Sequence, residues 1–161
     1  MDGTHQIPAS DRQTLVRLQR LLAVTLMAGI AGMGLELLLI GHVEDRLQLV
    51  PVGLLGAGAI AVAWHAVRSS ALSVRIVRVL MALFVGSGVL GVGLHYRGNH
   101  EFELEMYPSL TGIELVRKTL TGATPVLAPG SMAVLGFIGL AAVYRTPPAK
   151  ADRTGVGRDA L

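Results

Sequence analysis

Four long apolar stretches constrain this chain more than any other feature of its sequence. They cover residues 21–40, 50–67, 79–96 and 125–144, and charged side chains are nearly absent from them. A helix of about 20 residues is long enough to cross the roughly 30 Å hydrocarbon core of a bilayer. Buried helices of a soluble protein are the alternative, but four such stretches in 161 residues favour spans. The sequence therefore predicts an all-α membrane protein, a four-transmembrane-helix bundle.

The composition agrees with this interpretation. Charged residues make up 16% of the chain, whereas soluble domains typically carry about 25%. Many of the 20 glycines lie inside the apolar stretches, and glycine is more frequent in membrane helices than in soluble ones. The chain has no cysteine, and this excludes disulfides, thiolate zinc sites and thiol catalysis.

The basic residues indicate how the helices are oriented. Ten of them flank the spans on one side, and four lie on the other. The first group is Arg12, Arg17, Arg20, Arg68, Arg75, Arg78, Arg145, Lys150, Arg153 and Arg158, and the second is Arg46, Arg97, Arg117 and Lys118. The positive-inside rule then predicts that both termini are cytoplasmic. The basic residues form no contiguous face, so nucleic-acid binding is not expected.

The spans divide the chain into segments. We expect residues 1–20 to be a retained cytoplasmic segment rather than a cleaved signal peptide, because polar residues precede the first span. Residues 21–144 form the transmembrane domain, in which Pro129 is a position where the last helix can kink or start late. Residues 97–124 form an outer loop. Residues 145–161 are polar and rich in proline and glycine, and are expected to be disordered.

The outer loop carries its own local patterns. Residues 97–99 read as a turn, because glycine and asparagine tolerate left-handed backbone. Acidic and apolar residues alternate over residues 101–106, and a period of two predicts an extended segment. Thr111 and Glu114 have capping-box spacing and predict a short helix, ended near Gly122, that lies on the outer leaflet as an extracytoplasmic interfacial helix.

Small residues recur at helical spacing within the spans, as in the pairs Ala28–Gly32 and Gly136–Gly139. Small residues allow the backbones of membrane helices to approach closely. We favour packing within one bundle, while a homo-oligomer or another membrane protein as partner of these faces stays open.

A polar cluster is predicted at the outer ends of the first and third spans, which antiparallel packing would bring together. Imidazoles and carboxylates can bind zinc, iron, manganese or copper. The candidate ligands of such a divalent metal are His42, His95, His100 and Glu36. No compact metal motif is present, and we favour a solvated acidic rim, with the histidines bonded to neighbouring carboxylates and backbone, over a metal site. Its further members are Glu44, Asp45, Asn99, Glu101, Glu103 and Glu105.

Three segments together carry a resemblance to a known family. They are IGHVEDRLQLVP, LHYRGNHEFELEMYPSLTG and LTGATPVLAPGSM. The chain resembles, over residues 20–144, a family of small four-span bacterial integral membrane proteins of uncharacterised function. The resemblance implies a multi-pass protein of a bacterial inner (plasma) membrane, but no activity, cofactor or site residue.

The sequence therefore supports only a general hypothesis about function. No nucleophile elbow, P-loop or dinucleotide fingerprint is present, and we predict no catalytic residue. The leading hypothesis is a non-enzymatic structural, accessory or partner-binding membrane component whose outer loop makes the contacts. The alternatives are a metal-binding or metal-dependent redox protein, and a small transporter subunit in which Glu36 lines a cavity of an oligomer.

Overall fold

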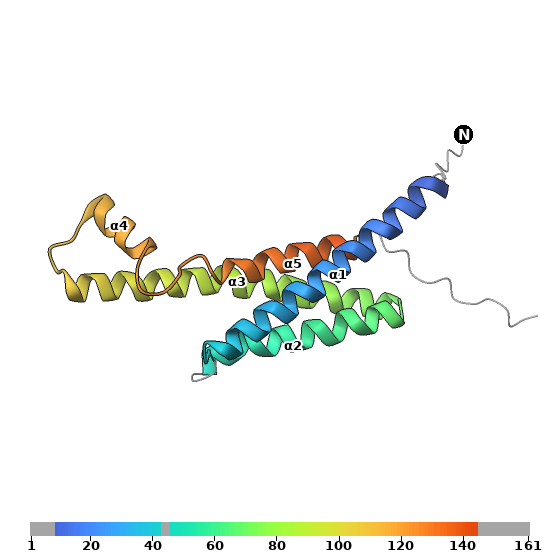
Figure 1. The fold of residues 1–161 in the computed structure, drawn as a ribbon, viewed down its shortest axis with the longest axis horizontal. Helices are drawn as coiled ribbons and strands as arrows, with labels where there is room; N and C mark the ends of the chain where they lie inside the picture. The colour runs from blue at the N-terminus through green and yellow to red at the C-terminus, as the bar shows by residue number, and fades with distance from the viewer. Residues whose placement is uncertain (1–8, 43–45, 145–161) are drawn as a thin grey trace, which may run out of the picture.

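The chain is entirely helical in the residues that the computed structural model describes, which are 9–42 and 46–144. Five helices follow one another (Figure 1): α1 (Ala9–Leu39), α2 (Arg46–Val67), α3 (Ala71–Met106), α4 (Gly112–Leu120) and α5 (Gly130–Ala142). The expected disordered tail, residues 145–161, lies outside the described residues, as do Glu44 and Asp45 of the polar cluster. The all-α prediction is confirmed for the described part of the chain.

Helices α1, α2 and α3 are long and apolar enough to cross a membrane. With a rise of about 1.5 Å per residue, the 22 residues of α2 extend for about 33 Å, close to the thickness of the hydrocarbon core. Large apolar side chains on the outside of these helices are exposed, such as Leu21 (66%), Ile60 (73%) and Val89 (63%). A water-soluble monomer rarely exposes so much apolar surface, and the three helices indicate a membrane protein.

Helix α1 ends in a tight turn at Gly41 and His42, and α2 packs against α1. The backbone N–H of His42 donates to Leu37 O at 2.9 Å, and that of Gly41 donates to Leu38 O at 3.2 Å. Gly41 has φ 68°, a left-handed conformation that glycine adopts without penalty. This pair of bonds is the Schellman motif, which satisfies the last carbonyls of a helix.

Helices α1, α2, α3 and α5 pack in a ring in which each contacts two of the others. Met81 and Phe84 of α3 are fully buried at the centre. The seam between α3 and α5 is the tightest, because a Cβ at Gly88 would lie 2.6 Å from the backbone nitrogen of Ala133, and one at Gly136 would lie 2.6 Å from Met81 O. Small residues thus permit the backbone contact expected of membrane helices.

The extended segment predicted for residues 101–106 is wrong, as is the turn predicted for residues 97–99. Both lie inside α3, which continues unbroken to Met106. Adding residues to an existing helix is easier than starting one, and Glu, Leu and Met are good helix formers whereas Glu is disfavoured in strands. The alternation of acidic and apolar residues covers only six positions, and this is too few to outweigh the preference of these residues for a helix.

The helix expected over residues 125–144 begins later than its apolar stretch. Helix α5 starts at Gly130 after Pro129, and a series of tight turns precedes it, including Ala128 N to Pro125 O at 3.2 Å. Pro129 has no N–H to donate to Pro125 O, the i−4 bond of an α-helix. The 13 residues of α5 extend for only about 20 Å, so the helix alone is shorter than a span.

Candidate functional site: the hairpin of α3 and α4

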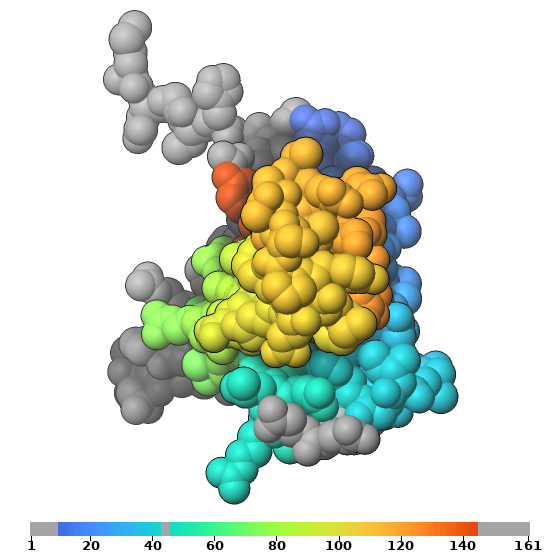
Figure 2. Space-filling model, turned by 90° about the vertical axis from the view of Figure 1, so that its left-hand side faces the viewer, coloured from blue at the N-terminus to red at the C-terminus, as the bar shows by residue number. Residues whose placement is uncertain are grey.

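The end of α3 and the whole of α4 form a helical hairpin that stands apart from the other helices (Figure 1). We call residues 97–124 the α3–α4 hairpin. Helix α3 continues beyond Tyr96 for ten residues, about 15 Å, and α4 packs back against it. Figure 2 looks onto this end of the molecule, where the hairpin (yellow and orange) is the nearest part.

The side chain of Asn99 holds the hairpin together. Asn99 is only 3% exposed. Its Nδ2 donates to Thr119 O at 2.9 Å and to Thr124 O at 2.8 Å. Its Oδ1 accepts from the backbone nitrogen of Thr124 at 3.2 Å and from the Thr124 hydroxyl at 2.7 Å. The amide thus uses both donors and accepts two bonds, which satisfies its full hydrogen-bonding capacity.

This arrangement requires a close approach of the backbone that follows α4. A Cβ on Gly122 would lie 2.9 Å from both Cγ and Nδ2 of Asn99. The neighbouring Thr119 is fully buried, and its hydroxyl has no hydrogen-bond partner among the described residues. The loop is therefore fitted around Asn99, while the Thr119 hydroxyl contributes no bond to it.

Helix α4 begins where the sequence predicted, with Thr111 as its N-cap residue. The predicted capping box is not formed, because the Thr111 side chain makes no cap hydrogen bond. The helix ends at Leu120, and the backbone N–H of Thr121 donates to Arg117 O at 3.1 Å. Contacts with α3, rather than a capping box, hold α4 in place.

The outer surface of the hairpin combines apolar and charged groups. Five of its exposed large apolar side chains, which we call the hairpin patch, are Phe102, Met106, Ile113, Val116 and Leu120. An exposed ion pair joins Arg97 Nε to Glu101 Oε1 at 2.7 Å. Lys118 Nζ lies 3.8 Å from the ring centroid of Tyr107, a cation–π contact. Acidic groups Glu105 and Glu114 are also exposed, so the surface is amphipathic.

The predicted metal ligands come from two elements. His95 and His100 both lie on α3, but five residues of helix separate them by about 140° around its axis. His95 Nδ1 lies 3.2 Å from Pro125 O and donates to it. This carbonyl receives no bond from residue 129, because Pro129 has no N–H, but it also accepts from Ala128 N. The His100 ring stacks on Tyr96, with centroids 6.2 Å apart.

The remaining two ligands belong to α1 and its terminal turn. Glu36 is exposed, and His42 is half-buried directly after Gly41. Within residues 9–42 and 46–144, no three His, Asp or Glu side chains are grouped closely enough to hold a metal ion. The metal site stays a prediction. The hydrogen bond from His95 Nδ1 to Pro125 O leaves His95 Nε2 able to bind a metal.

The sequence had placed Asn99 among the polar cluster, but nothing in the sequence indicated its role. Asn99 binds residues 20 and 25 positions away, and no local pattern reports such contacts. Comparisons with protein-family models, with curated proteins and with solved structures give no match to this chain. The family resemblance therefore also stays a prediction.

Proposed function

We propose that this protein is a non-enzymatic, multi-pass component of a bacterial inner membrane that binds the extramembrane segment of another membrane protein through its α3–α4 hairpin. The observation that carries the proposal is the buried Asn99 amide, whose four hydrogen bonds fix the hairpin. A docking element gains affinity from being held in its bound shape before it meets the partner.

The membrane topology is part of the proposal. We propose that α5 and the turns that begin at Pro125 together form a fourth span, since α5 packs antiparallel to α3 and contacts α1 as well. Both termini then lie in the cytoplasm, as the arginine distribution favours. The hairpin follows on the opposite side of the membrane, where α3 extends beyond the hydrocarbon core.

The hairpin patch supports a protein partner. Ile113 of α4 is 84% exposed, and Met106 is 57% exposed, although Met106 lies at the end of α3, about 15 Å beyond the predicted span. Interfaces place apolar and aromatic side chains at their centre and charged groups at the rim, and the hairpin has both kinds. An interfacial helix on the outer leaflet is the competing arrangement for α4, and it would bury the same side chains in lipid.

Site-specific photocrosslinking in living cells tests the proposal. A photoreactive amino acid at Ile113 is expected to give a discrete adduct with a second membrane protein. The matched position is Val24 of α1, which is 67% exposed and is expected to give lipid adducts alone. Asn99→Ala should abolish the Ile113 adduct and leave the Val24 products unchanged, because it releases the hairpin and not the spans.

Other products at Ile113 would contradict the proposal in identifiable ways. Lipid adducts alone would place α4 on the leaflet as an interfacial helix. An adduct with twice the mass of the chain would make the partner a second copy, as the small-residue faces also allow. A protein adduct that survives Asn99→Ala would show that a fixed hairpin is not what the partner recognises.

A further inference from the structure

A second feature lies at the opposite end of the molecule, where α1 and α2 diverge (Figure 1). A cleft of about 390 Å³ opens there between the start of α1 and the end of α2, with α3 and α5 as its floor. This volume lies within the range of small-molecule and cofactor sites. Its lining residues are Val16, Gln19, Arg20, Ala23, Leu26, Val62, His65, Ala66, Ser69, Val77, Gly139, Ala142 and Val143.

The polar and apolar walls of the cleft are separated along α1. Arg20 lies towards the end of the molecule, and Ala23 and Leu26 follow it along the same face of the helix. From Arg20 to Leu26 the helix rises about 9 Å. Val62 and Val77 continue the apolar wall on α2 and α3. The cleft therefore has one cationic end and an apolar interior.

Hydrogen bonds fix the walls of this cleft. Gln19 Nε2 donates to Tyr144 O at 2.9 Å, and Arg78 Nη2 donates to Val143 O at 3.2 Å. These bonds hold the chain after α5 against α1 and α3. The cleft is therefore part of the packed structure rather than a gap between loose helices.

His65 is also held in place. Its Nδ1 lies 2.8 Å from Ser73 Oγ, which also lies 3.0 Å from two carbonyl oxygens, those of Arg68 and Ser70. We assign the Nδ1–H tautomer to His65, because the carbonyls can only accept and the hydroxyl has one proton. This N–H is then committed to Ser73 and is not available to an occupant of the cleft. Arg20 is the cation of the cleft.

The charge of this end favours an anionic occupant. No Asp or Glu lines the cleft, and Arg20 has no hydrogen-bond or ion-pair partner among the described residues. The only acidic residue near this end in the described chain is Asp11. The arginines of the same end are Arg12, Arg17, Arg20, Arg68, Arg75 and Arg78. Basic sites between membrane helices are typical binding places for anionic lipid headgroups.

We propose that this cleft binds one anionic phospholipid of the surrounding leaflet. The guanidinium of Arg20 receives the phosphate, for which its planar set of donors is well suited. One acyl chain lies along Ala23, Leu26, Val62 and Val77. A lipid fits better than a soluble anion because the apolar walls would otherwise stay uncovered below the headgroup.

Native mass spectrometry of the full-length protein tests this assignment, with phosphatidylglycerol and phosphatidylcholine of identical acyl chains as probes. We expect one phosphatidylglycerol per chain, bound about fivefold more tightly than phosphatidylcholine, as one arginine near an anionic headgroup would give. Arg20→Gln should remove this preference. Arg17→Gln removes the same charge from the same helix outside the cleft and should retain it. Ala23→Leu fills the cleft and should weaken both lipids.

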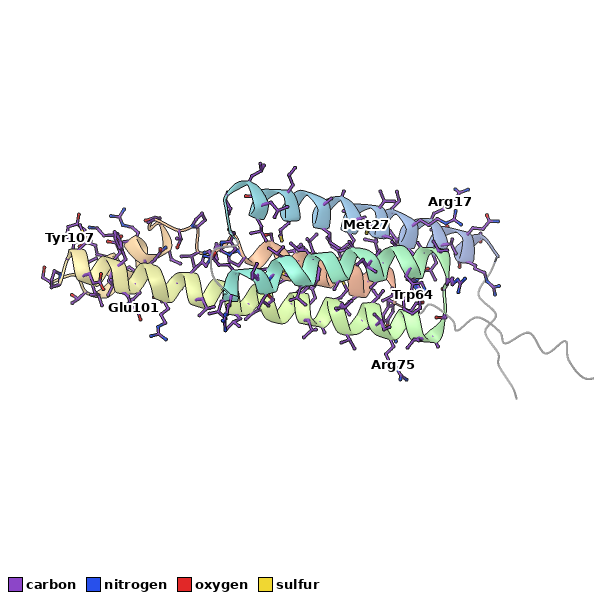
Figure 3. All side chains as sticks on the ribbon, turned by 90° about the horizontal axis from the view of Figure 1, so that it is seen from below. Arg17, Met27, Trp64, Arg75, Glu101 and Tyr107 are labelled. Atoms are coloured by element: carbon purple, nitrogen blue, oxygen red, sulfur yellow. The ribbon has the colours of Figure 1, made fainter. Side chains whose placement is uncertain are left out.

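Trp64 gives a second readout at the same end of the molecule. It is the only tryptophan of the chain and precedes His65 on α2 (Figure 3). Phosphatidylglycerol with brominated acyl chains should quench its fluorescence, and the quenching should weaken in Arg20→Gln but not in Arg17→Gln.

Three results would overturn the assignment. Equal loss of preference in Arg17→Gln and Arg20→Gln would reduce it to general surface charge. Equal affinity for both phospholipids in the wild type would show that the headgroup is not recognised. Tighter binding of oleate than of phosphatidylglycerol would make a free fatty acid the occupant.

Discussion

The two ends of the molecule, marked by Tyr107 and Arg17 in Figure 3, use polar side chains in opposite ways. At the hairpin end, the amide of Asn99 is buried and saturated by the protein itself. At the other end, Arg20 lines an open cleft and has no partner among the described residues. A saturated buried group is a structural fixture, because it has no capacity left for a ligand. The Arg20 side chain, which lies beside apolar walls, can still bind a ligand.

The largest loss of stability is expected when the Asn99 side chain is removed from the α3–α4 hairpin. Asn99→Ala should lower the free energy of unfolding of the hairpin by about 3 kcal/mol, since it leaves Thr119 O and the backbone groups of Thr124 without partners. Limited proteolysis between α4 and α5 measures the loss. Arg97→Ala removes an exposed ion pair, which contributes little, and is the matched control. Equal protease resistance of the two variants would contradict the role of Asn99.

The next largest effect concerns the seam that joins the two ends. Gly88→Ala should destabilise the protein by about 2 kcal/mol, because the new methyl group meets the backbone of Ala133 and overpacks the contact. Gly86→Ala lies on the same helix, where a Cβ would meet no atom within 4 Å, and should be neutral or stabilising. Thermal unfolding in detergent compares the two. Equal stability of the two variants would mean that the contact between Gly88 and Ala133 has room for a methyl group.

A smaller effect is expected at the start of α3. Ser73 and Ser70 form a capping box, with Ser73 N to Ser70 Oγ at 3.1 Å and Ser70 N to Ser73 Oγ at 2.9 Å. Ser73→Ala should cost roughly 1–2 kcal/mol, because it removes half of the box and the partner of His65. It should also weaken phosphatidylglycerol binding slightly by releasing a wall of the cleft. Stability equal to that of the wild type would show that the box contributes nothing.

Thr119 offers a change with a small effect of opposite sign. Thr119→Val keeps the shape of the side chain and removes a buried hydroxyl that has no partner within the described chain. The variant should be as stable as the wild type or up to about 1 kcal/mol more stable. Thermal unfolding measures it, with Thr124→Val as the contrast, since that hydroxyl donates to Asn99 and its loss should destabilise. A destabilised Thr119→Val would reveal a hydrogen bond at this hydroxyl.

Elemental analysis of the protein in nanodiscs tests the predicted metal site, and here we expect no change. The wild type and a triple variant, His42→Ala, His95→Ala and His100→Ala, should contain the same amount of metal after incubation with zinc, iron, manganese or copper. Docking by the hairpin requires no ion. About one metal per chain, lost in the triple variant, would instead support the metal-dependent alternative.

The fold class and three of the helices follow from the sequence alone. Long apolar stretches such as residues 21–40 can satisfy their backbone hydrogen bonds in a bilayer only as helices, and this requirement is local. The start of α4 at Thr111 likewise follows from short-range spacing. The exact length of α3 was not predictable from periodicity, because residues 101–106 fit a strand by alternation and a helix by propensity.

Only the tertiary structure decided what the polar residues do. Asn99 and Thr124 are 25 positions apart, so their bond depends on how α4 folds back onto α3. The cleft at Arg20 needs four helices to form its walls, and no single stretch of sequence contains it. Local sequence determines which segments are helical and apolar, because hydrogen bonding within a helix and transfer into lipid depend on near neighbours. Whether the hydrogen-bonding groups of a polar side chain are satisfied by the protein depends on residues that are far away in the sequence.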